Sequence, residues 1–209
     1  LVDRALDAYW RGKHYSEICL LVCKHSQLAK HPRSRVSSFL VDGGPTVWGC
    51  VSLFDNLLEN ARLNEELRKE LPSANWSLAV QACLQRSIES HKDIDRSEAA
   101  TIADRVRDLG GVGIKFQATA VARVQFAAQR YGDVLATLGK DDGSELFKDA
   151  HALQLIRAVK DESKSLNVPD ARTVGDYYYR KEQWVSAGVY YRIAEEAGRM
   201  GDCLHYAAE

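Results

Sequence analysis

The sequence predicts an all-α fold, and three observations carry the prediction. Apolar residues recur at intervals of three and four, which places them on one face of a helix. Runs of alternating β-branched residues, which are typical of strands, are few, and the 209 residues include only 4 prolines. We expect about eleven helices joined by short turns. Two such series are Trp76, Ala79, Val80, Cys83, Leu84 and Ile88, and Ala99, Ile102, Ala103, Val106 and Leu109.

Helix-breaking residues near the N-terminus predict a first boundary. Residues 1–40 are expected to form a helical hairpin, and residues 41–46, which contain two glycines and a proline, a linker. Residues 47–209 then form a larger region of repeated helices.

Within that region the expected helices follow one another with short links. Pro72 ends one helix, and Ser97 precedes another that ends at Gly110 and Gly111. Residues 141–144, Asp-Asp-Gly-Ser, separate two more. Helices connected in this way form either a bundle or a stack of hairpins in a solenoid.

Composition excludes several classes of protein. The 28 basic and 29 acidic residues give a net charge of −1, whereas a general nucleic-acid binder carries a clear basic excess. No apolar run approaches the roughly eighteen residues that span a membrane. Five cysteines at irregular spacing favour reduced thiols, and so a cytoplasmic location. Because the chain begins at Leu1 without a methionine or a secretory segment, we expect a processed chain or a fragment.

The clearest repeat occupies residues 168–201, where small and large side chains alternate at helical spacing. The positions that carry the pattern are Gly175, Tyr178, Trp184, Ala187, Tyr191 and Ala194. This pattern resembles the tetratricopeptide repeat (TPR), a helix–turn–helix unit of about 34 residues. In that family large rings fill the space beside small residues, so we predict that Tyr178, Trp184 and Tyr191 are core. Glu182 stands where the family has a turn glycine, and Arg199 where it has a closing proline.

Two weaker matches and one incomplete match extend the resemblance. Residues 5–28 and 120–138 have bulky and small residues in the corresponding roles, at irregular spacing. Residues 202–209 read as the first helix of a truncated repeat, so further chain is expected to follow. The resemblance therefore implies an irregular array of antiparallel helical hairpins, a TPR-like α-solenoid that winds as a right-handed superhelix.

The resemblance also implies where a partner binds. In this family one face of the first helices lines a concave groove, and aromatic and arginine side chains dominate binding hot spots. The alternative is that these side chains are half-buried contacts between repeats. Acidic residues such as Asp176 at the carboxylate-binding positions of the family argue against chaperone-tail binding. The predicted partner-binding residues are Trp10, Arg11, Arg123, Phe126, Arg172, Tyr179 and Arg180.

No motif indicates catalysis or a bound metal. One helix cannot direct all of Cys19, Cys23, His25 and His31 to a single zinc ion. The glycines of residues 110–113 lack the strand and the Lys-Ser/Thr of a phosphate-binding loop. No cysteine has a local feature that would activate it as a nucleophile. We therefore expect no cofactor and no enzymatic activity.

Three functions remain from different classes. The first is a non-catalytic protein–protein interaction module that holds a peptide or partner helix in its groove, without binding nucleic acid or membrane. The second is a structural or regulatory arm of a larger signalling, trafficking or secretion assembly. The third is an enzyme whose site comes from residues distant in sequence. Fold resemblance alone does not name the partner.

Overall fold

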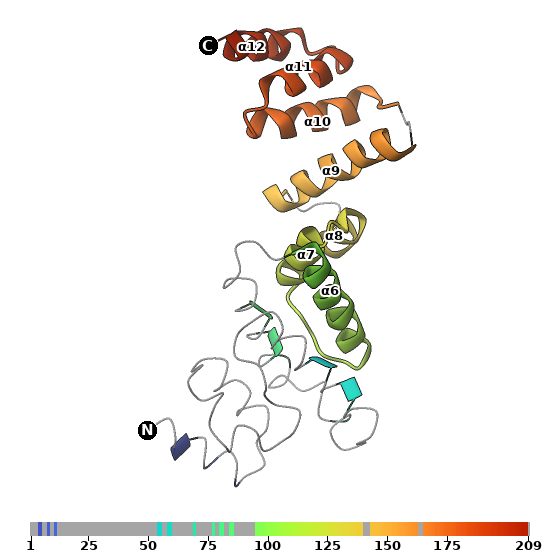
Figure 1. Cartoon of the computed structure of the whole chain (residues 1–209), viewed down its shortest axis with the longest axis vertical. Helices are drawn as coiled ribbons and strands as arrows, with labels where there is room; N and C mark the ends of the chain where they lie inside the picture. The colour runs from blue at the N-terminus through green and yellow to red at the C-terminus, as the bar shows by residue number, and fades with distance from the viewer. Residues whose placement is uncertain are drawn as a thin grey trace. The chain divides into compact units, whose positions relative to one another are not determined.

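The structure, a computed structural model, describes residues 95–139, 143–162 and 165–208, together with isolated positions among the first 94 residues. Within these ranges every regular element is an α-helix, which confirms the all-α prediction for this part of the chain (Figure 1). The helices are α6 (Arg96–Gly111), α7 (Ala118–Ala127), α8 (Tyr131–Leu138), α9 (Glu145–Glu162), α10 (Val168–Arg180), α11 (Trp184–Ile193) and α12 (Ala197–Ala208).

The chain divides into two compact units, residues 1–129 and 130–209. Helices α6 and α7 belong to the first unit and α8 to α12 to the second. The linker predicted at 41–46 lies outside the described residues, as does most of the hairpin predicted at 1–40. None of the helices in the described ranges is long and apolar enough to cross a membrane.

In the first unit, α6 buries the stripe predicted from its spacing. Ala99, Ile102, Ala103, Val106 and Leu109 are all buried, and α6 packs against α7. The N-cap is Asp95, two residues before the Ser97 that the sequence suggested, because the Asp95 carboxylate accepts a hydrogen bond from the backbone N–H of Ser97 (3.2 Å). As predicted, the glycine pair ends the helix.

In the second unit, each helix packs against its neighbours in the sequence. The contacts run from α8 to α9, α9 to α10, α10 to α11 and α11 to α12. Helix α10 begins at the first residue of the predicted 168–201 repeat, where the Asn167 side chain accepts a hydrogen bond from the backbone N–H of Asp170 (2.8 Å). Helix α12 begins at Ala197, inside that range, so it starts earlier than the truncated repeat predicted at 202–209.

The same tight turn joins α10 to α11 and α11 to α12. Glu182 and Glu195 each adopt a left-handed backbone, with φ of 56° and 58°. The next backbone N–H in each turn reaches back five residues, from Gln183 to Tyr178 and from Glu196 to Tyr191 (2.9 Å each). This is the Schellman arrangement, which glycine usually completes. A glutamate therefore adopts the backbone conformation of the turn glycine that the sequence lacks at position 182.

Candidate binding groove

At the interface between α10 and α11, the ring of one tyrosine packs directly against one glycine. Tyr191 of α11 is completely buried, and a Cβ atom added to Gly175 of α10 would lie 2.8 Å from its ring. Real Cβ atoms do not approach other atoms so closely, so a side chain at position 175 would force the ring to move. Tyr191 thus packs as the repeat pattern predicts, while Tyr178 and Trp184 are half-buried.

Further rings extend this contact across three helices. Tyr179 meets Trp184 edge-on, with ring centroids 5.1 Å apart, and Trp184 meets Tyr206 of α12 at 5.0 Å. Tyr178 and Tyr190 stack with an interplanar angle of 15° and centroids 5.5 Å apart. Edge-to-face and offset-stacked pairs are the favourable arrangements of aromatic rings. The aromatic segment that stands out in the sequence therefore holds α10, α11 and α12 together.

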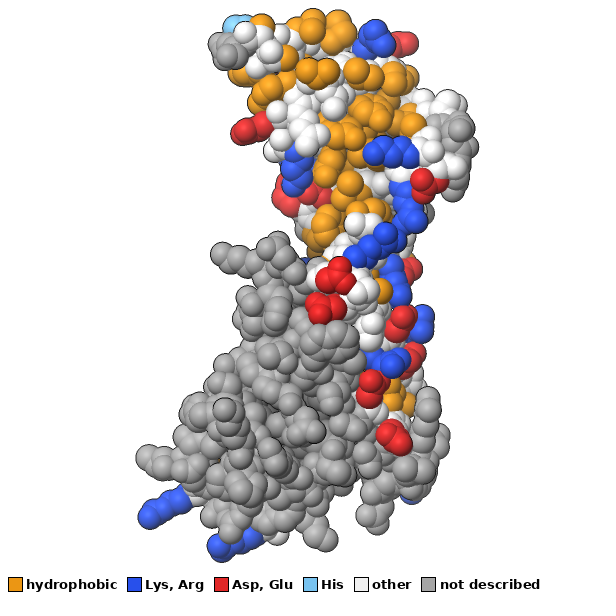
Figure 2. All heavy atoms as spheres, in the orientation of Figure 1, with side chains coloured by type: hydrophobic (Ala, Val, Ile, Leu, Met, Phe, Trp, Pro, Cys, Tyr) orange, Lys and Arg blue, Asp and Glu red, His pale blue; other side chains and the backbone are white. Residues whose placement is uncertain are grey.

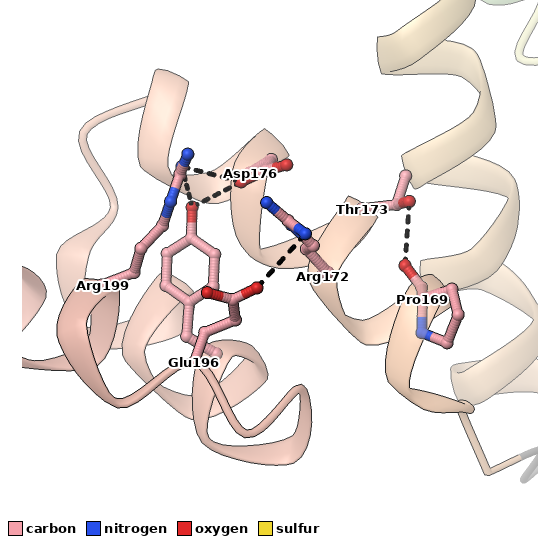
Figure 3. A network of polar contacts seen from close by, with 7 residues as sticks. Pro169, Arg172, Thr173, Asp176, Glu196 and Arg199 are labelled. Carbon is pink, nitrogen blue, oxygen red and sulfur yellow. Dashed lines mark hydrogen bonds and ion pairs between the residues drawn. The ribbon is translucent and has the colours of Figure 1, made fainter.

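A polar network on the same helices satisfies the buried hydroxyl of Tyr191. The hydroxyl donates to Asp176 at 2.7 Å, and the Arg199 guanidinium lies 2.9 Å from the same carboxylate and 3.1 Å from the hydroxyl oxygen. Figure 3 shows Asp176 and Arg199 converging, with Arg172 turned to Glu196, to which it pairs at 3.3 Å. Burial, together with the hydrogen bond to Asp176, raises the pKa of Tyr191 to about 12.

A second ionic cluster joins α9 to α10. Arg180 pairs with Asp149 at 2.7 Å and with Glu145 at 3.1 Å, and Lys181 pairs with Asp149 at 2.9 Å. Burial acts to raise the pKa of Asp149, but the hydrogen bonds from Arg180 and Lys181 outweigh it, and the pKa is lowered. Arg180 is thus engaged in ion pairs between α9 and α10.

The predicted partner-binding residues do not all lie together. Arg172 and Tyr179 lie on α10 toward α11 and α12, where the Arg199 guanidinium is 6.0 Å from the Tyr179 ring centroid. Arg180 instead pairs with α9. The others belong to the first unit or are not described. Arg123 is exposed and Phe126 half-buried on α7, Arg11 is an exposed isolated position, and Trp10 lies outside the described residues.

An open apolar groove of about 440 Å³ runs between α11 and α12. Several of its residues are unusually exposed for their type: Val185 is 73% and Leu204 65% accessible. In Figure 2 hydrophobic side chains gather over the C-terminal helices. The lining residues are Trp184, Val185, Gly188, Val189, Arg192, Met200, Cys203, Leu204 and Ala207.

The sequence did not predict this groove, although it contains a signal for it. One apolar face of helix α11, which includes Tyr191, is buried against α10. Val185, Val189 and Arg192 form a second stripe at intervals of four and three. A helix that is apolar around most of its circumference needs cover on more than one side.

The chemistry of the described residues offers neither a metal site nor an activated thiol. No group of three or more His, Cys, Asp or Glu side chains converges in the part of the chain that the structure describes. Cys203 is buried and unpaired, and burial raises the pKa of its thiol, which disfavours the reactive thiolate. The four residues weighed as zinc ligands lie outside the described residues.

Comparison with known proteins adds no relative. No protein-family model, curated protein or solved structure matches this chain.

Proposed function

We propose that this chain is a non-catalytic interaction module that binds a protein or peptide partner through a TPR-like helical array. The observation that carries the proposal is the open groove between α11 and α12, along which Val185, Val189 and Leu204 are exposed. Exposed apolar surface of this kind marks interaction sites in folded proteins. The packing of Tyr191 on Gly175 and the left-handed turn at Glu182 support the TPR-like repeat.

The proposal places binding at the α11–α12 groove instead of the aromatic face of α10. Arg172 and Arg180 already pair with Glu196 and with Asp149, and Tyr179 contacts Trp184. Side chains engaged in this way would have to give up internal contacts to bind a partner. The groove residues Val185 and Leu204 would lose only their exposure to water. The proposal includes a cytoplasmic location, for which the irregularly spaced cysteines are the support.

Capture of a partner tests the proposed function. The tagged chain, immobilised and exposed to an extract of its source cells, should retain one or a few proteins in near-stoichiometric amounts. Tag alone is the matched control. Retention of no protein above that control would contradict an interaction module.

A further inference from the structure

We propose that the α11–α12 groove receives one amphipathic helix of a partner, with an acidic side chain of that helix paired to Arg192. This inference rests on the proposed function and specifies its ligand. The shape of the groove, the backbone that it accepts and the charge at its edge support this inference.

The groove has a floor of small residues between exposed walls. A Cβ atom added to Gly188 of α11 would lie 3.5 Å from the Cβ of Cys203 on α12, so the two helices approach closely there. Cys203 is buried, whereas Val185 and Leu204 project into solvent. A hollow with small residues at its base and larger ones along its edges accepts a bulky apolar side chain from a third element. The same chain already places Tyr191 over Gly175 in this manner.

The walls of the groove determine what backbone the occupant has. Both walls are helices, whose central N–H and C=O groups are bonded within the helix. They therefore offer no row of free backbone groups to an extended peptide. A strand laid in the groove would bury peptide groups without hydrogen bonds, which is costly. A helix satisfies its own backbone, and about three turns match the length of α11.

The charge of the groove lining indicates which residues the partner helix carries beside its apolar face. Arg192 is the charged residue of the lining, none of the lining residues is acidic, and Arg192 forms no ion pair with the described residues. Arg192 is exposed at the edge of the groove, where a partner that covers the groove can pair a carboxylate with this guanidinium. A symmetric contact between two copies of the groove would instead bring together two arginines and no carboxylate. The charge pattern thus favours a different, acidic partner over a second copy of the chain.

Designed peptides of about 18 residues, labelled for fluorescence anisotropy, test the inference. One carries leucines at i, i+4 and i+7 with glutamates beside this stripe, and its twin replaces the glutamates with lysines. We expect the wild-type chain to bind the glutamate peptide about tenfold more tightly than the lysine peptide. Arg192→Glu should reverse that preference. A glutamate peptide with a central proline, which cannot remain helical, should lose binding.

Two matched variants locate the site. Leu204→Asp places a charge in the groove and should weaken binding of the glutamate peptide about tenfold or more. Val168→Asp makes the same kind of change at an exposed apolar residue of α10, outside the groove, and should leave binding unchanged. Circular dichroism of both variants checks that they remain folded.

Several outcomes would overturn the inference. The inference is wrong if the chain binds both twin peptides equally, or if it still binds the proline peptide. It is also wrong if Val168→Asp weakens binding of the glutamate peptide as much as Leu204→Asp does. Dimerisation of the chain that Leu204→Asp abolishes would assign the groove to a second copy. A cellular partner captured equally by wild type and Leu204→Asp would end this inference but preserve the proposed function, whereas capture of none by either bait contradicts the function itself.

Discussion

Two neighbouring helix interfaces use a glycine in different ways. At the α10–α11 interface, a Cβ atom on Gly175 would lie 2.8 Å from the Tyr191 ring, so the space beside the glycine is filled. At the α11–α12 interface, a Cβ atom on Gly188 would lie at an ordinary 3.5 Å from Cys203, and an open groove lies beside it. The filled interface is also closed by the hydrogen bonds of Asp176 and Arg199.

The difference separates stability from recognition. The buried ring and its polar partners make the α10–α11 interface a structural core, where any change of volume has a cost. The α11–α12 groove still exposes apolar side chains, so changes there should affect partner binding far more than folding. Three substitutions and a change of pH test this contrast, with effects expected to decrease from the removal of the Tyr191 ring to the substitution of Gly188.

Removal of the ring should have the largest effect. Tyr191→Ala leaves a cavity beside Gly175 and removes the hydroxyl that contacts both Asp176 and Arg199, so we expect the free energy of unfolding to fall by about 3–5 kcal/mol. Urea denaturation followed by circular dichroism measures it. Tyr191→Phe keeps the ring and loses only the hydroxyl, and should cost about 1–2 kcal/mol. A loss below about 1 kcal/mol in Tyr191→Ala would show that the ring is not a core element.

The second largest loss of stability is expected when a methyl group is added at position 175. Gly175→Ala forces the Cβ into a ring that burial and the hydrogen bond to Asp176 hold in place. Overpacking of this kind costs about 1–3 kcal/mol, offset in part by the better helix propensity of alanine. Thermal unfolding should show a lower Tm. An unchanged or higher Tm would mean that the ring moves aside freely.

Alkaline pH should weaken the same interface. The pKa of Tyr191 is raised from 10 in the unfolded chain to about 12 in the folded one. Between these values the unfolded state releases a proton that the folded state keeps, so stability is full below pH 10 and declines as the pH rises to about 12. Tyr191→Phe lacks this component but retains the other tyrosines. The difference in unfolding free energy between wild type and Tyr191→Phe should therefore shrink over this range, and a constant difference would contradict the prediction.

Gly188, the glycine beside the groove, should tolerate substitution by alanine, whereas Gly175 should not. Gly188→Ala meets only an ordinary contact with Cys203, and alanine favours the helix by up to about 1 kcal/mol. We expect a small rise in Tm. A loss as large as that of Gly175→Ala would remove the contrast between the two interfaces.

The sequence predicted the filled interface because its determinants are local. Gly175 and Tyr191 belong to one helical hairpin, and the resemblance to the tetratricopeptide repeat predicts that a large ring fills the space beside a small residue there. The engagement of Arg180 could not be predicted, because its partners Glu145 and Asp149 lie on another helix, more than thirty residues away along the chain. Whether Tyr179 binds a partner or packs internally depends in the same way on the position of Trp184 and Arg199.

The groove was harder to predict for a different reason. Periodicity shows that Val185 and Val189 form an apolar stripe, but it does not show whether another element covers that stripe. Only the placement of α12, with Leu204 and Cys203 opposite, reveals a groove with an exposed edge. The resemblance to the tetratricopeptide repeat instead predicted binding on α10, because proteins of that family bind partners on the first helices.

The footprint of the bound helix tests the central claim most directly. Backbone hydrogen exchange, read by mass spectrometry with and without the glutamate peptide, reports which helices become protected. We expect new protection in Trp184–Ile193 and Ala197–Ala208, and none in Val168–Arg180. Protection confined to Val168–Arg180 would return the binding site to the aromatic face of α10 and contradict the claim.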